Sequence, residues 1–71
     1  MAETRLIHGH NVTFEENAHD GIRYLRDDLD HAEAQVYFDQ AKMNHAAEFE
    51  DKYNHQYTLV HEGENYVLLR R

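Results

Sequence analysis

None of the 71 residues is a cysteine, so the fold cannot rely on the disulfide bonds that stabilise many short chains. The same absence rules out thiolate zinc sites and iron–sulfur clusters. A chain of this length buries only about 60% of the surface that its unfolded form exposes. Tight packing, a metal held by histidine or carboxylate, or a second subunit must therefore supply the remaining stability.

Fourteen acidic and seven basic residues give the chain a formal net charge of −7. Arg23 and Arg26 lie among the seven carboxylates between Glu15 and Glu33, whereas binding to phosphates needs clustered lysine and arginine. We therefore expect no direct binding to nucleic acid or to an anionic membrane. The expected partner is a protein with a neutral, basic or apolar surface.

No compositional boundary divides the chain, which has no proline, no linker rich in serine or glycine and no internal repeat. Residues 1–71 are therefore expected to form one small α+β domain. Residues 1–5 lack the apolar stretch of a signal peptide. No apolar run approaches the ~20 residues that span a bilayer, so the expected location is cytoplasmic.

The clearest local pattern predicts a β-hairpin in the last third of the chain. Residues 57–61 and 66–70 are rich in β-branched, aromatic and other apolar side chains. Gly63 followed by Glu64 suits a two-residue type II′ turn, which needs a positive φ at its first central position. That turn would place Val60 opposite Val67 and Leu59 opposite Leu68.

A long helix is predicted over residues 31–53. Asp30 and Glu33 have the spacing of a capping box at its start. The segment that follows has no glycine or proline and is rich in alanine, glutamate and glutamine. Asn54 and His55 mark its expected end.

The first third of the chain allows two interpretations. Residues 6–14 alternate as a strand, and the pair Asp20-Gly21 is typical of a turn before a second strand at 22–26. The predicted fold is then β-β-α-β-β, a four-stranded antiparallel sheet with one long helix packed on it. Ile22, Leu25 and Leu29 also fit a helical stripe, which gives the alternative order β-α-α-β-β with residues 18–29 helical.

Two apolar bands follow the predicted long helix at 100° per residue. One band contains Ala34, Tyr37, Phe38, Ala41, Phe49 and Tyr53, with His45 among them, and the other contains Ala32, Val36, Met43, Ala46 and Ala47. A helix on its own sheet needs only one band, although alanine and single exposed apolar residues are ordinary on helix surfaces.

The second band indicates that another subunit or protein covers the helix, and a symmetric dimer is the default geometry. The expected interface residues are Phe38, His45, Phe49, Tyr53, Val36 and Met43. The hairpin raises the same question, because its other face carries Val60, Val67 and Leu69 rather than a clean polar pattern.

Seven histidines suggest a metal site as the alternative function. His8 and His10 would project to one face of a strand, and His61 on another strand could complete a three-histidine zinc site. Gly9 lies between the pair, where a turn would separate the two rings. Solvated or structural histidines are the simpler interpretation.

The sequence offers few residues suited to nucleophilic catalysis. There is no serine or cysteine nucleophile, and no glycine-rich loop of the kind that binds phosphates or dinucleotides. We therefore expect a protein that is not an enzyme and needs no cofactor.

Carboxylates cluster at the start of the predicted helix, where Asp27, Asp28, Asp30 and Glu33 form an acidic patch. Such a patch can simply be a solvated face. It can also engage a basic surface, as a small acidic inhibitor or regulator of a nucleic-acid-binding protein would. The function expected from the sequence is a dimeric protein-binding module, with a histidine-based metal-binding protein as the alternative.

Overall fold

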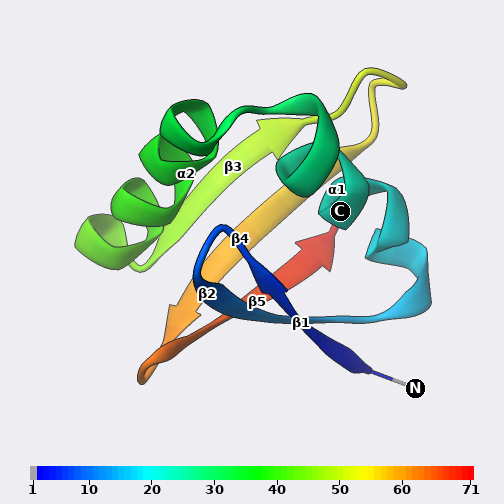
Figure 1. The fold of residues 1–71 in the computed structure, drawn as a ribbon. Coiled ribbons are helices and arrows are strands. Elements are labelled where there is room, and N and C mark those ends of the chain that lie inside the picture. Colours follow the sequence, from blue (N-terminus) through cyan, green and yellow to red (C-terminus); the bar gives the residue numbers. More distant parts are fainter. Residues whose placement is uncertain (1) are drawn as a thin grey trace.

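The computed structural model describes residues 2–71. Met1, which belongs to the segment 1–5 discussed above, lies outside the described residues. The strands are β1 (Glu3–Ile7), β2 (His10–Phe14), β3 (Ala46–Glu50), β4 (Gln56–Glu62) and β5 (Asn65–Arg70). The helical segments are η1 (Glu16–Ala18), α1 (His19–Arg23), η2 (Tyr24–Asp28) and α2 (His31–Asn44). Figure 1 shows the helical segments gathered over one face of the sheet, which confirms the predicted α+β class.

The five strands form one mixed sheet in the order β1-β2-β5-β4-β3. All neighbours are antiparallel except β2 and β5, which pair in parallel over Val12–Phe14 and Tyr66–Leu68. The prediction of four antiparallel strands is therefore wrong in strand number and in direction. A parallel pair needs a long crossover, and here all the helical segments, β3 and β4 lie between its two strands.

The C-terminal hairpin has the predicted register. Val60 pairs with Val67 and Leu59 with Leu68 across β4 and β5. Gly63 has a φ of 59°, as the first central position of a type II′ turn requires.

The predicted strand at residues 6–14 is in fact two strands of a second hairpin. His8 and Gly9 both have positive φ, 49° and 86° respectively, so the chain reverses between Ile7 and His10. Two consecutive positive φ values are typical of a type I′ turn, whose twist matches that of the strands on either side.

The predicted strand at 22–26 is wrong, and the helical alternative for residues 18–29 describes this segment better. Residues 19–23 form α1, and residues 24–28 continue as a π-helical turn in which Leu29 N–H donates to Tyr24 O at 3.0 Å. Ala18, Ile22 and Leu25 lie on the buried side of this segment. The apolar residues recur with the spacing of a helix, and burying them favours a helix here over the turn that Asp20-Gly21 indicated.

The predicted helix over 31–53 begins where expected but ends early. Both hydrogen bonds of the Asp30–Glu33 capping box are present. The helix ends at Asn44, His45 takes the left-handed conformation with a φ of 70°, and β3 follows. Residues 46–50 alternate between exposed and buried, as expected for a strand. They pair with β4 although their side chains favour a helix locally.

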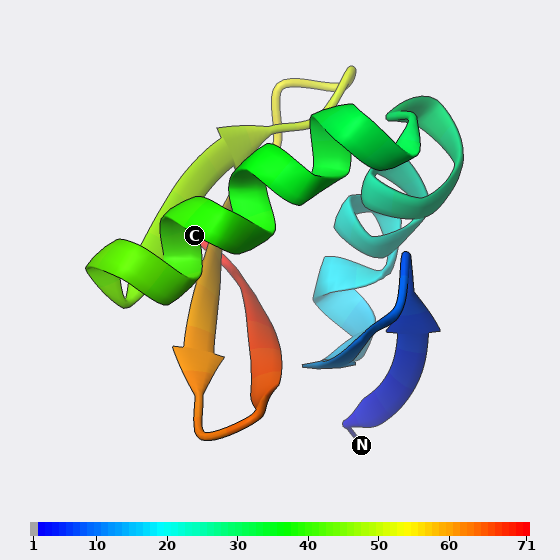
Figure 2. The same ribbon diagram turned by 60° about the vertical axis from the view of Figure 1, so that its left-hand side comes forward.

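The hydrophobic core lies between the sheet and the helical layer. Its strand residues are Ile7, Val12, Phe14, Ala47, Phe49, Tyr57, Leu59, Tyr66 and Leu68, and its helical residues are Ala18, Ile22, Leu25, Ala34, Phe38 and Ala41. Figure 2 shows α2 lying along β3 and β4, with α1 beside the hairpin of β1 and β2. Strands β2 to β5 therefore give alternate side chains to one covered face, and β1 contributes Ile7 alone.

Candidate functional site

The loop between β3 and β4 is organised by the carboxylate of Asp51, which is only 5% exposed. Its Oδ1 accepts hydrogen bonds from Tyr53 N–H at 2.8 Å and His55 N–H at 3.0 Å. Its Oδ2 accepts one from the Tyr57 hydroxyl at 2.9 Å. Asn54, with a φ of 65°, completes the turn by donating its N–H to Asp51 O at 3.1 Å.

These bonds determine the charge state of Asp51. Burial alone would raise its pKa, but the hydrogen bonds from His55 N–H, the Tyr57 hydroxyl and Tyr53 N–H outweigh burial and hold the pKa below its usual value. Because both oxygens are already occupied, Asp51 serves to fix the loop.

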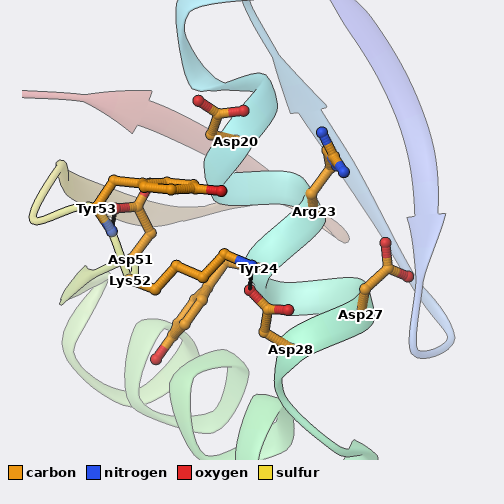
Figure 3. A pocket seen from close by; sticks show the side chains of 8 residues that line it. All are labelled: Asp20, Arg23, Tyr24, Asp27, Asp28, Asp51, Lys52 and Tyr53. Carbon is orange, nitrogen blue, oxygen red and sulfur yellow. Dashed lines mark hydrogen bonds and ion pairs between the residues drawn. The ribbon is translucent and has the colours of Figure 1, made fainter.

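A small crevice lies where this loop meets α1 and η2. Its cavity volume is about 50 Å³, far below the ~300 Å³ at which sites for small organic ligands begin. Space of this size suits one charged group. It is lined by the eight side chains drawn in Figure 3: Asp20, Arg23, Tyr24, Asp27, Asp28, Asp51, Lys52 and Tyr53.

The crevice already contains an ammonium group from the chain itself. Lys52 Nζ lies 3.6 Å from Asp28 Oδ2 and 5.5 Å from the centroid of the Tyr53 ring. In Figure 3 the Lys52 side chain reaches toward Asp28 between the rings of Tyr53 and Tyr24. A carboxylate beside an aromatic face is a favourable environment for a cation.

The other charges at the crevice differ in how well they are paired. Arg26 donates two hydrogen bonds of 3.0 Å to Asp27, and these bonds are the main cause of the lowered pKa of that carboxyl. The Asp20 carboxylate makes no hydrogen bond or ion pair to any of residues 2–71. Asp20 and Asp28 are therefore the acids with capacity for a further cation.

The aromatic rings of the crevice are held in different ways. Tyr24 stacks on Phe49, with ring centroids 6.0 Å apart and planes 13° from parallel. Burial is the main cause of the raised pKa of the Tyr24 phenol, which therefore stays neutral. Tyr53 is 61% exposed, so its ring forms an outer wall that is open to solvent.

The predicted acidic patch is divided by the structure. Asp27 and Asp28 line the crevice. Asp30 and Glu33 instead hold the N-terminus of α2, where Asp30 Oδ1 accepts a 2.8 Å bond from Glu33 N–H. Half of the patch therefore has a structural task.

The predicted interface residues do not form one surface either. Phe38 and Phe49 belong to the core, at 0% and 6% exposure. Val36 and Met43 are 60% and 81% exposed on α2, while His45 ends that helix and Tyr53 lies at the crevice.

The three histidines proposed as metal ligands do not meet at one point. His8 Nε2 lies 2.8 Å from Leu25 O, and the turn at Gly9 separates it from the other two. His10 lies 3.0 Å from Gln35 Oε1 and stacks on Phe38. His10 and His61 do line the same open hollow, beside Lys42, Gly63, Glu64 and Tyr66. Residues 2–71 contain no group of three or more histidines or carboxylates placed to hold a metal ion.

Sequence reasoning missed Asp20, Arg23, Tyr24, Asp51 and Lys52 as members of the crevice. A strand at 22–26 and a helix through residue 53 would have kept these residues apart. The available signal was the helical alternative for residues 18–29, which places Asp20, Tyr24, Asp27 and Asp28 on neighbouring turns.

Comparison with protein-family models, curated proteins and solved structures found no match to this chain. Within residues 2–71, no helix is both long enough and apolar enough to cross a membrane.

Proposed function

We propose that the protein is a non-enzymatic binding module whose crevice receives a lysine or arginine side chain from a basic segment of another protein. The observation that carries this proposal is the position of Lys52, whose ammonium lies between the Asp28 carboxylate and the Tyr53 ring. Lys52 marks the place that a partner's cation would take.

The hold on Lys52 is weak enough for exchange. Its side chain is 58% exposed and that of Asp28 is 36% exposed, and ion pairs this exposed contribute about 0–1 kcal/mol. A partner's side chain would form the same contacts and could also reach Asp20. A cavity of about 50 Å³ accommodates such a group.

The charge of the whole chain supports the same class of partner. A net charge of −7 attracts basic proteins over distances comparable to the Debye length, about 8 Å at physiological salt. The basic surface of a nucleic-acid-binding protein has the required chemistry, so an inhibitor or regulator of such a protein belongs within the proposal.

The test uses a short fluorescein-labelled peptide rich in lysine and measures its binding by fluorescence anisotropy at low salt. Lys52→Gln removes the internal cation and should strengthen binding by about fivefold, the factor that corresponds to about 1 kcal/mol. Lys42→Gln is the matched control, because Lys42 lies in the last turn of α2 and lines the other hollow. Its effect should be much smaller.

Asp28→Asn should weaken binding of the same peptide, and Glu64→Gln, an identical loss of charge in the β4–β5 turn, should have a smaller effect. Equal effects within each pair would reduce the interaction to net charge and would contradict the proposed crevice. Absence of peptide binding at low salt would contradict it as well.

A further inference from the structure

The outer edge of β1 is not paired with any element of residues 2–71. β1 is the first strand in the sheet order and pairs with β2 alone. The residues from Ala2 to Leu6 are all exposed. An exposed edge strand presents unpaired backbone N–H and C=O groups to which another strand can bind. Proteins often block such an edge with proline, lysine or a bulge, and β1 has none of these.

The pairing with β2 shows which backbone groups of β1 are free. The turn at residues 8–9 joins Ile7 to His10, and the two residues that flank a two-residue turn form a hydrogen-bonded pair. Hydrogen-bonded and non-hydrogen-bonded pairs then alternate along the strands. Odd-numbered residues of β1 therefore direct their N–H and C=O groups to β2, and even-numbered residues direct theirs outward. The 2.8 Å bond between the hydroxyls of Thr4 and Thr13 agrees with this pattern, because non-hydrogen-bonded pairs bring side chains closer together.

We propose that β1 pairs in antiparallel direction with β1 of a second copy of this chain, so that two five-stranded sheets join in a symmetric dimer. A two-fold axis at Thr4 places Thr4 opposite the partner's Thr4 and Ala2 opposite the partner's Leu6. Residues 2, 4 and 6 all direct their backbone groups outward, so each facing pair can exchange two hydrogen bonds.

The charges of β1 select this register. Glu3 then faces the partner's Arg5, and Arg5 faces the partner's Glu3, at the positions where side chains of facing strands lie closest. Opposite charges at facing positions stabilise a strand pair, and like charges destabilise it. An axis at Glu3 or at Arg5 would satisfy the backbone equally well but would bring two like charges together. The register centred on Thr4 is therefore the one in which β1 is complementary to itself.

The other edge strand, β3, is unsuited to the same contact. Its exposed side chains include Glu48 and Glu50, so pairing with its own copy would bring like charges together. On β1 the two charges cancel. Glu3 and Arg5 form an exposed ion pair of 3.3 Å within one chain, which contributes little and can be exchanged for the pairs across the axis. Because two chains of net charge −7 repel each other, the dimer should dissociate on dilution.

The experiment measures molar mass by light scattering and sedimentation over a range of protein concentrations. Glu3→Arg should raise the dissociation constant of the wild-type dimer by about tenfold, because arginines then meet on both sides of the axis. Arg5→Glu should have the same effect through glutamates. An equimolar mixture of the two variants should form dimers again, because their β1 strands are complementary to each other. Glu64→Arg, the same charge reversal in the β4–β5 turn, should not weaken the dimer.

A second pair of variants tests the backbone hydrogen bonds. Thr4→Pro removes an N–H that points outward and none that bonds to β2, so it should weaken the dimer by about tenfold or more while circular dichroism shows an intact fold. Thr4→Ala is the matched control, because it loses the same hydroxyl and keeps the N–H. Its dimer should be as stable as that of the wild type.

A monomeric wild type at millimolar concentration would overturn the proposal. A dimer that both Glu3→Arg and Arg5→Glu leave unchanged would overturn it as well. So would a mass that rises beyond the dimer, since pairing of β1 with β3 of the next copy forms open chains. If Thr4→Pro does not fold, the mixture of the two charge variants still decides the question. The crevice is lined by residues outside β1, so this outcome is independent of peptide binding.

Discussion

Gly21 lies directly against the ring of Tyr57, so that a β-carbon at residue 21 would come within 2.7 Å of Tyr57 Cε1 and 2.8 Å of Cδ1. The Tyr57 ring cannot easily move away, because it is completely buried and its hydroxyl donates a hydrogen bond to Asp51. The close approach of α1 to the sheet therefore depends on the absence of a side chain at this position.

Gly21→Ala should destabilise the protein by about 1–3 kcal/mol, the usual effect of overpacking a core. This is the opposite of what a helix position normally shows, since alanine favours a helix over glycine by about 1 kcal/mol. Urea unfolding followed by circular dichroism measures the change. Gln40→Ala, on the exposed side of α2, should be neutral or slightly stabilising. A more stable Gly21→Ala protein would contradict the close contact.

Asp51→Asn should destabilise the protein by about 1–3 kcal/mol at pH 7, because it weakens the acceptor for three hydrogen bonds. The pKa of Asp51 is lowered in the folded protein. Its contribution to stability is therefore present above the unfolded pKa of about 4 and is lost as the pH falls through the folded value. The difference between wild type and variant should shrink toward pH 2 in urea titrations, and a constant difference would argue against the charged form.

The Gly21–Tyr57 contact also explains which parts of the fold could be predicted from sequence. The β4–β5 turn at Gly63 and the Asp30–Glu33 cap are set by residues a few positions apart, and both were predicted correctly. Gly21 was taken for a turn residue because its partner is 36 positions away, on β4. Local pattern contains no information about such a partner.

The prediction of a helix over residues 46–50 was wrong for a related reason. Alanine and glutamate favour a helix locally, yet Ala47 and Phe49 pair with Leu59 and Tyr57 on β4, and that pairing was invisible before the register was known. The crevice likewise has one part that the sequence predicts and one part that it does not. Asp27 and Asp28 were recognisable as an acidic run, but Lys52 comes to them only because β3 returns the chain to η2.

Tyr57→Phe should reduce stability at pH 7 by about 1–2 kcal/mol, because the buried Asp51 oxygen loses its hydroxyl donor. Burial, followed by the hydrogen bond to Asp51 and its negative charge, raises the pKa of the Tyr57 phenol far above its ordinary value. In the unfolded chain this phenol ionises near pH 10, so its contribution is present below that pH and is lost as the pH rises further.

Stability measured at alkaline pH therefore distinguishes the wild type from Tyr57→Phe. Between about pH 9 and pH 11 the wild type should lose more stability than Tyr57→Phe, as measured by thermal unfolding at each pH. Identical pH profiles would mean that the phenol ionises equally easily in both states, contrary to its burial.

His45→Gly should stabilise the protein by about 1 kcal/mol. His45 follows the last residue of α2 with a φ of 70°, a left-handed conformation that costs residues with a β-carbon about 1–2 kcal/mol and that glycine adopts freely. The hydrogen bond that it accepts from His61 N–H, at 3.1 Å, uses its backbone oxygen and survives the change. Asn44→Gly, one position earlier and inside the helix, should instead destabilise the protein. Urea unfolding of the two variants gives opposite signs if strain dominates. If His45→Gly is destabilising, the imidazole makes a contact that outweighs the strain, and the interface role predicted for His45 from the sequence becomes the better explanation.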